Sequence, residues 1–284
     1  MIKVAILHST LRKEEKLISG AARGRGIPIR LIDIRQTILA PGSPALECDV
    51  ALERSVSTVK GFYAAAAFEA RGIPVVNPSA TARICGDKFL TSLRLQEAGV
   101  PVPRFLMVFD REQARAAVET LGGFPVVVKP PQGSWGRLLA RINDQDALDA
   151  VLEHKQVLGT PPQKAFYIQE YMEKPGYDIR AFMAGDEVLC AIARESDHWI
   201  TNTALGGRAR DYPVDGELEE ICHRTSHALG GGLLAVDLFA AGDGLLVNEV
   251  NHTMEFRNSE EPTGVSISNA ILDHCLRAAR GEVL

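Results

Sequence analysis

Two carboxylates and a carboxamide stand close together near the carboxyl end of the chain. An apolar segment carries Asp237, a turn-forming stretch follows at 241–244, and a second apolar segment carries Glu249 and Asn251. This order predicts a β-hairpin. A turn centred near Asp243 places Asp237 opposite Glu249, with Asn251 on the same face. Oxygen ligands of this kind suit Mg²⁺ held together with nucleotide phosphates. The alternative, a solvated strand face with incidental acids, agrees less well with the apolar neighbours.

Two lysines occupy unusual places. Lys129 ends a wholly apolar run of three valines, where a lysine points into a cleft or pairs with another group. The glycine-containing loop just after it, 133–136, can wrap phosphates with its backbone N–H groups. Lys88 opens a predicted helix, a place that the helix dipole makes unfavourable for a cation alone but favourable for a bound anion. A solvated surface position explains Lys88 by itself equally well.

Charged side chains also interrupt two apolar strands that follow. Arg180 and Arg194 lie among apolar residues, where a guanidinium group needs an anion. Strand alternation puts Asp178 and Arg180 on one face. A simple two-residue hairpin would put Arg194 on the opposite face, so a bulge or a twist is required for both arginines to reach one phosphate. The strand-to-loop edge at 168–173 could offer backbone groups to a purine.

The elements that position these residues fall into three units. Residues 1–80 alternate strands with helices, which predicts a doubly wound parallel sheet of α/β type. No G-x-G-x-x-G follows the first strand, so a dinucleotide site of the usual kind is not expected there. Residues 81–164 form a second unit with a linker at its end. Residues 165–284 begin with strands and are expected to be of α+β type.

Composition limits the classes of function. The chain has 284 residues, 46% hydrophobic and 24% charged, with a net charge of −5. Ordinary globular composition excludes disorder, and the acidic balance argues against a general nucleic-acid binder. No apolar run is long enough for a membrane span. Five scattered cysteines predict free thiols in a reducing cytoplasm.

Taken together, the motifs resemble the ATP-grasp ligases, and within them the RimK-like branch. More narrowly they are similar to the LysX group, which joins α-aminoadipate to a carrier protein in lysine biosynthesis. The match covers nearly the whole chain in the expected order of a pre-ATP-grasp, a central lid and a metal-bearing domain. The runs that carry it are VALER (50–54), CGDK (85–88), GSWGR (133–137), HWITNTA (198–204) and NEVNHTMEF (248–256).

The resemblance implies a nucleotide site that binds ATP, with Mg²⁺ as two ions and Mn²⁺ as an alternative. Asp237, Glu249 and Asn251 would hold the metal. Arg180 and Arg194 would be catalytic, meeting the γ-phosphate, the acyl phosphate or the substrate carboxylate. The other ATP-binding residues would be Lys88, Lys129, Gly133, Ser134, Trp135, Gly136, Arg137, Gln169, Glu170, Tyr171, Met172, Asp178 and Asn202.

The resemblance also implies the amino-acid site. Its residues would be Arg194, Thr203, Ala204, Glu255, Phe256, Arg257, Asn258 and Ser259. In this family an Asn-Ser pair at 258–259 goes with α-aminoadipate, whereas a Gly-Phe type pair goes with glutamate. Trp199 could flank this pocket or simply pack in the core.

The implied reaction starts from a carboxylate, which is a poor electrophile. ATP phosphorylates the side-chain carboxylate of the carrier's C-terminal glutamate, and the α-amino group of the amino acid attacks the acyl phosphate. The partner is a small acidic amino-group carrier protein of the LysW type, and the enzyme is expected to be a homo-oligomer, a dimer or a tetramer. Two alternatives stay open: glutamate transfer to the carrier or to a ribosomal protein tail, and a nucleotide-binding regulatory protein without turnover.

Overall fold

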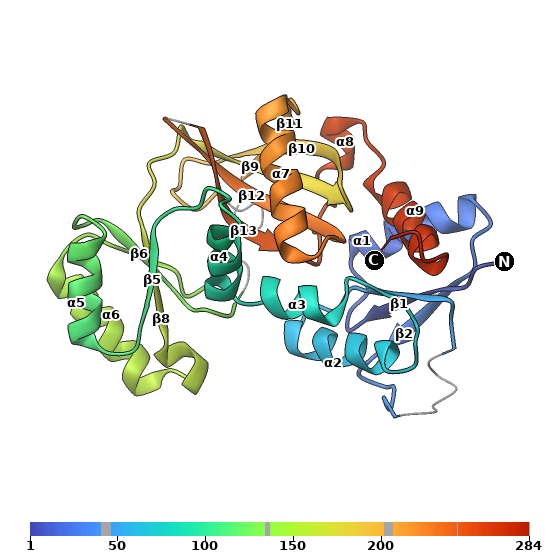
Figure 1. The fold of residues 1–284 in the computed structure, drawn as a ribbon, viewed down its shortest axis with the longest axis horizontal. Helices are drawn as coiled ribbons and strands as arrows, with labels where there is room; N and C mark the ends of the chain where they lie inside the picture. The colour runs from blue at the N-terminus through green and yellow to red at the C-terminus, as the bar shows by residue number, and fades with distance from the viewer. Residues whose placement is uncertain (41–46, 134–136, 202–206, 243, 284) are drawn as a thin grey trace.

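A computed structural model describes residues 1–40, 47–133, 137–201, 207–242 and 244–283. Figure 1 shows three β-sheets in this part of the chain, each with its own helices. They follow one another along the sequence, apart from the last helix, Ile267–Ala279, which returns to the first sheet.

The first sheet is parallel, with the strand order β2-β1-β3-β4. Along β1 alternate side chains face opposite layers: Val4 and Ile6 pack toward α1, whereas Ala5 and Leu7 pack toward α2. Helices therefore cover both faces, and the predicted doubly wound fold is confirmed. The elements are β1 (Val4–His8), α1 (Lys13–Gly24), β2 (Ile29–Asp33), β3 (Val50–Glu53), α2 (Thr58–Glu69) and β4 (Val75–Val76).

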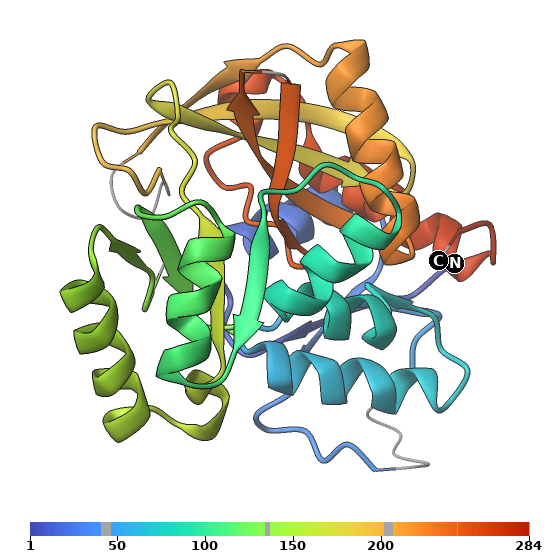
Figure 2. The same ribbon diagram turned by 60° about the vertical axis from the view of Figure 1, so that its left-hand side comes forward.

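The second sheet is antiparallel, with the order β5-β8-β6-β7, and packs one face on α5 and α6 (Figure 2). Strand β8 follows the expected division after residue 164, yet it pairs with β5 and β6. The division itself stays a prediction. The elements are α3 (Ser79–Cys85), α4 (Lys88–Glu97), β5 (Phe105–Val108), α5 (Arg111–Thr120), β6 (Val126–Lys129), β7 (Ala140–Ile142), α6 (Gln145–Leu158), η2 (Pro161–Lys164) and β8 (Phe166–Glu170).

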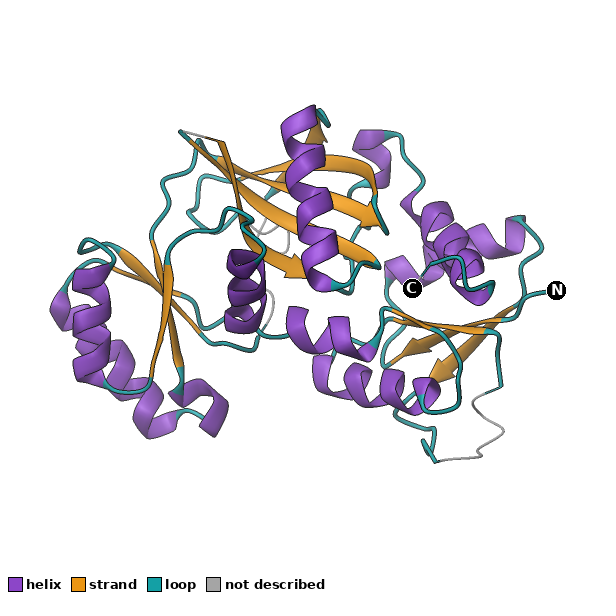
Figure 3. Ribbon diagram, viewed as in Figure 1, coloured by secondary structure: helices purple, strands orange, loops and turns teal. Residues whose placement is uncertain are grey.

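The third sheet has the order β11-β10-β9-β12-β13 and is antiparallel throughout (Figure 3). One face packs on α7, while the other shares a continuous core with α1, α9 and the first sheet. The first and third units are therefore joined by apolar packing. The elements are β9 (Tyr177–Ala184), β10 (Glu187–Glu195), β11 (Arg208–Tyr212), α7 (Gly216–Leu229), β12 (Leu233–Ala241), β13 (Gly244–Asn251), α8 (Glu260–Thr263) and α9 (Ile267–Ala279).

Candidate active site

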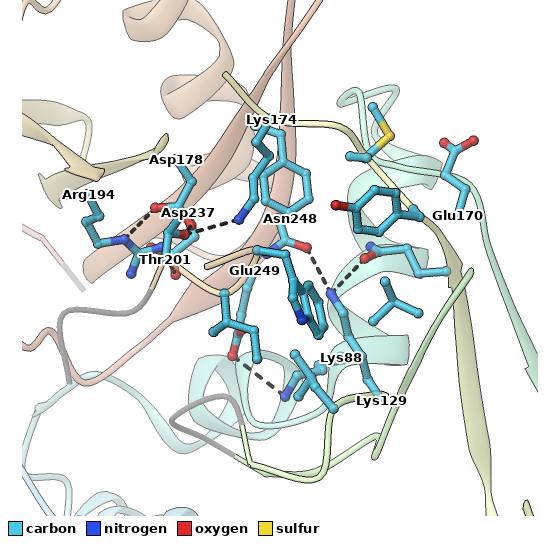
Figure 4. A pocket seen from close by; sticks show the side chains of 18 of the residues that line it. Lys88, Lys129, Glu170, Lys174, Asp178, Arg194, Thr201, Asp237, Asn248 and Glu249 are labelled. Atoms are coloured by element: carbon cyan, nitrogen blue, oxygen red, sulfur yellow. Dashed lines mark hydrogen bonds and ion pairs between the residues drawn. The ribbon is translucent and has the colours of Figure 1, made fainter. Parts of the chain in front are cut away.

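A cleft of about 700 Å³, including its open mouth, lies between the second and third sheets. Its walls carry charged side chains at one end and apolar side chains at the other (Figure 4). Such a mixture suits a ligand with an apolar ring and a charged tail. The lining residues that the sequence predicted are Lys88, Lys129, Gly133, Gln169, Glu170, Tyr171, Met172, Asp178, Arg194, Asp237 and Glu249.

The hairpin β12–β13 has the predicted register, with Asp237 opposite Glu249. The pairing then slips, because Leu238 lies opposite Val247 and Asn248 is the extra residue of a β-bulge. A bulge redirects side chains, and here the neighbours Asn248 and Glu249 both line the cleft. Asn251 lies opposite Ala235, outside the lining of this cleft.

Asp237 is held by two arginines. Arg180 binds it with Nε and Nη2, at 2.6 and 2.7 Å, and Arg194 Nη2 lies 3.1 Å from its Oδ2. Burial by itself would raise the pKa of this carboxyl, but the two guanidinium groups outweigh it and lower the pKa.

A second bulge brings Arg194 to this place. The β9–β10 register shifts between Val188 and Cys190, so that Arg194 lies opposite Asp178 on the face that Arg180 shares. The bulge that the sequence required is therefore present, although the shared anion in the structure is Asp237. Arg194 Nε also binds Asp178 Oδ1 at 2.6 Å, and these carboxylates raise the pKa of Arg194 against the effect of burial.

Lys129 is buried, and its ammonium group points into the cleft. Nζ donates to Gln169 Oε1 at 2.7 Å and to Asn248 Oδ1 at 2.9 Å. Gln169 is oriented in turn by its donation to Tyr167 Oη. Since both partners of Lys129 are neutral, burial lowers the pKa of the lysine to about 8. An anion in the cleft would therefore gain a cation whose present partners carry no charge.

Lys88 is the first residue of α4, as predicted, and Asp87 caps this helix by accepting from Phe89 N and Leu90 N. The Lys88 ammonium group donates to the carbonyl of Gly133 at 2.6 Å and lies 3.6 Å from Glu249 Oε1. Lys88 therefore joins the start of the 133–137 loop to the hairpin carboxylate.

The apolar end of the cleft is formed where β8 leaves its sheet. Glu170 turns its carboxylate outward to Arg104, at 2.7 Å from Nε, so it would meet a ligand through its backbone. Tyr171 and Trp199 both line the cleft, with ring centroids 6.4 Å apart and ring planes tilted by 60°. The guanidinium group of Arg141 lies 4.1 Å from the Tyr171 ring centre. These rings and the apolar lining fit a flat heterocycle such as a purine.

A metal ion fits the charged end only together with phosphates. Asp237 and Glu249 offer oxygen atoms from paired positions on neighbouring strands. In the part of the chain that the structure describes, no three His, Cys, Asp or Glu side chains are grouped as a metal site. The two carboxylates would thus need further oxygen ligands from a nucleotide, which is how Mg²⁺ is usually held in such enzymes.

Other predicted residues lie outside the cleft or outside the described residues. Phe256 and Ser259 are buried, Phe256 within the core shared by the first and third units, whereas Arg257 and Asn258 are exposed. Glu255 pairs with Arg12 at 3.3 Å. Arg137 is exposed near the cleft loop. The predicted residues that lie outside the described ranges are Ser134, Trp135, Gly136, Asn202, Thr203 and Ala204.

Several lining residues were not predicted. Lys174 is largely buried, donates to Thr201 Oγ1 at 3.2 Å and lies 5.3 Å from the Phe239 ring centre. Thr201 donates to Asp178. The sequence around Lys174, in the loop between β8 and β9, gives no sign of this role, because the role depends on how the third sheet packs. The remaining unpredicted lining residues are Val127, Leu139, Ile200, Phe239 and Asn248.

Comparison with known proteins agrees with this geometry. Residues 85–275 match the RimK-like ATP-grasp domain, and residues 4–84 match the LysX pre-ATP-grasp domain. The chain therefore belongs to the RimK-like ATP-grasp family, with a pre-ATP-grasp domain of the LysX type. It is an ATP-dependent carboxylate–amine ligase, as the sequence predicted, and the ligases of this family use ATP and Mg²⁺.

Two relatives match over nearly their full length. The glutamate–LysW ligase ArgX of Sulfurisphaera tokodaii is 32% identical over 96% of this chain and 98% of its own. The α-aminoadipate–LysW ligase LysX of Sulfolobus acidocaldarius is 34% identical over 93% and 97%. Among solved structures, a RimK domain ATP-grasp protein of Sphaerobacter thermophilus superposes with a TM-score of 0.81 at 30% identity, covering 96% of this chain and 99% of that one.

No helix in the described residues is both long and apolar enough to cross a membrane. None of the five cysteines, all of which lie in the described residues, forms a disulfide bond.

Proposed function

We propose that this enzyme joins the α-amino group of α-aminoadipate to the side-chain carboxylate of the C-terminal glutamate of a LysW-like carrier protein, in lysine biosynthesis. The observation that carries the proposal is the single cleft in which Lys88, Lys129, Arg194, Asp237 and Glu249 meet. Full-length similarity to two LysW ligases supports the acceptor.

The choice of amino acid rests on Asn258 and Ser259, since that pair goes with α-aminoadipate in this family. Glutamate is the second candidate, because the relatives include glutamate–LysW ligases at the same level of identity. A ribosomal tail as acceptor and a regulatory protein without turnover are the weaker alternatives. The intact set of cations and carboxylates in the cleft argues against loss of turnover.

Each part of the cleft would act on one part of the reaction. Backbone groups at 170–172 and the rings of Tyr171 and Trp199 would hold adenine, and Asp178 the ribose. Lys88, Lys129 and the 133–137 loop would bind the phosphates. These cations and the two arginines would offset the charge that develops during phosphoryl transfer.

Asp237, Glu249 and Asn251 would hold Mg²⁺, which when bound supplies further positive charge at the phosphates; two ions are proposed. To do so, Asp237 would have to release Arg180 and Arg194. Phosphate oxygens would then replace Asp237 as the partners of the two arginines. The cleft would exclude water when the middle unit closes, which protects the acyl phosphate from hydrolysis. Asn202, Thr203, Ala204 and 255–259 complete the proposed site. We also expect the enzyme to be a homo-oligomer in the cytoplasm.

One assay tests the proposal. The enzyme is incubated with Mg-ATP and the acidic carrier, with α-aminoadipate or glutamate at equal concentration, and the carrier's mass is measured. A mass increase with α-aminoadipate, at a higher kcat/KM than with glutamate, is expected. Preference for glutamate would move the enzyme to the second candidate, and no adduct with either amino acid would refute carrier ligation.

A further inference from the structure

Unpaired buried polar atoms gather at one edge of the first sheet. Among the residues that the structure describes, six buried side-chain nitrogen and oxygen atoms have no hydrogen-bond partner, and only His274 contributes atoms elsewhere. The other four atoms are His8 Nδ1, Glu14 Oε2, Arg54 Nη2 and Ser55 Oγ. Such atoms cost free energy unless something else satisfies them, so a cluster of them needs partners such as a ligand or ordered water.

Topology explains why these atoms meet. β1 ends at His8 and β3 ends at Glu53, and the two strands are parallel neighbours. Ligands of open parallel sheets bind at the carboxyl ends of the strands. The loop after β3 then places Arg54 against the first turn of α1, where Arg54 Nε donates to Glu15 Oε1 at 3.0 Å. We call His8, Arg12, Glu14, Arg54 and Ser55 the polar edge.

Arg12 forms the solvent-facing side of the polar edge. It shares Glu15 with Arg54, at 2.9 Å, and its Nη1 lies 3.3 Å from Glu255 Oε1. The Arg12 and Glu255 side chains are 15% and 30% exposed, whereas those of Arg54 and Glu15 are 3% and 0% exposed. A ligand would therefore reach Arg12 first and the inner atoms after it.

The chain just after the polar edge contacts the segment that leads into the nucleotide cleft. Thr58 is the first residue of α2 and lies against Gly86. A Cβ atom added at Gly86 would come within 2.6 Å of Thr58 Cγ2. Lys88 follows Gly86 by two residues and lines the cleft. Glu255, which pairs with Arg12, begins the segment 255–259 that is expected to bind the amino acid.

We propose that the polar edge binds the head group of the amino-acid substrate, with Arg12 and Arg54 holding its α-carboxylate and Glu14 its α-ammonium group. This inference rests on the proposed function. An amino acid brings one negative and one positive group, so it satisfies an unpaired donor and an unpaired acceptor without changing the net charge of the cluster. The segment after the polar edge contacts the segment before Lys88, which connects this site to the cleft in which the carboxylate is activated.

The test compares two amines that differ only in the α-carboxylate. α-Aminoadipate and 5-aminovalerate are each supplied to the wild type and to Arg12→Gln, with Mg-ATP and the carrier, and kcat/KM is taken from the carrier adduct. For α-aminoadipate the variant should lose about tenfold to hundredfold through a higher KM, the effect of one charged hydrogen bond. For 5-aminovalerate it should change little, and the KM for ATP should stay the same.

A purely structural role for Arg12 gives a different result. If the variant only loosened Glu255, kcat/KM would fall equally for both amines, and the inference would be overturned. A raised KM for the carrier, or no effect at all, would overturn it as well. Arg12→Lys should restore part of the α-aminoadipate binding, and Lys16→Gln, an exposed change on the same helix, should behave as wild type.

A binding measurement separates this inference from the proposed function. Calorimetry with AMP-PNP and Mg²⁺ records α-aminoadipate binding without turnover. Weaker binding to Arg12→Gln than to the wild type supports the polar edge even where no carrier adduct forms. Equal binding, or none to the wild type, contradicts it. Glutamate and 4-aminobutyrate form the equivalent pair if the enzyme prefers glutamate.

Discussion

Arg194 reaches Asp237 across an intervening strand. Its Nη2 lies 3.1 Å from Asp237 Oδ2, although β9 separates the strands β10 and β12 that carry them. On β9 itself, Arg180 holds the same carboxylate through two hydrogen bonds. One acidic side chain thus fixes two arginines from two strands, so its charge organises the whole charged end of the cleft.

Removing that charge should be costly. In Asp237→Asn, two guanidinium groups lose their shared counter-charge in a buried place, and the free energy of unfolding should fall by about 3–5 kcal/mol at pH 7. Urea denaturation measures it. Asp149→Asn is the control, because Asp149 pairs with Arg115 on the surface. Equal midpoints for the two variants would contradict the structural role of Asp237.

The acid side of the stability profile should depend on the same residue. Since the pKa of Asp237 is lowered in the folded protein, its contribution is complete above the unfolded value, about 3.9, and is lost as the pH falls through the folded value. Between pH 5 and 3 the wild type should therefore lose stability faster than Asp237→Asn. Parallel curves for the two proteins would show that the carboxyl is not perturbed.

Glu249→Ala should stop turnover and leave the fold intact. The Glu249 side chain is 28% exposed, and its ion pair with Lys88 is long, at 3.6 Å. Its loss should therefore remove little stability. As a proposed metal ligand, however, it should lower kcat by about a hundredfold or more. Rates of carrier modification and thermal unfolding measure the two effects. Glu220→Ala, exposed on α7, should change neither, and a fully active Glu249→Ala would refute the metal assignment.

Lys129 should make stability rise on the alkaline side. Its pKa is about 8 in the folded protein and about 10.4 unfolded, so the unfolded chain binds more protons between these values. The free energy of unfolding should therefore increase with pH across this window, by up to about 3 kcal/mol. Denaturation midpoints of the wild type and Lys129→Met at pH 7 and pH 10 measure it. The difference between the two proteins should change with pH, and a constant difference would exclude the lowered pKa.

Local patterns were enough to predict the doubly wound first unit, the β12–β13 hairpin and one register. Apolar runs and turn residues predicted the hairpin and placed Asp237 opposite Glu249. Lys88 at a helix start and Lys129 at a strand end were also recognisable, because a charge at either place is unusual. These signals lie within a few residues of the atoms that they concern.

Positions that depend on the exact strand pairing or on packing between the units left no such signal. The sequence does not show where the pairing of β12 and β13 shifts its register, so the bulge residue Asn248 could not be identified from it. Lys174 belongs to the cleft only because the third sheet packs there. Strand β8 follows the expected boundary at 164, but its partners β5 and β6 lie before that boundary. Such placements depend on pairing between distant segments, which composition and periodicity do not contain.

Asn77 links the first and third units by hydrogen bonds, and its loss should lower stability. Its Nδ2 donates to Leu233 O at 2.8 Å, and its Oδ1 accepts from Leu233 N at 2.6 Å, so it imitates a strand partner for β12. Asn77→Ala leaves both buried backbone groups unpaired and should lower the free energy of unfolding by about 3 kcal/mol or more. Hydrogen exchange should show faster exchange in β12 as well as a lower unfolding midpoint. Asn143→Ala, exposed in the second unit, is the matched control, and equal midpoints for the two variants would show that apolar packing alone joins the units.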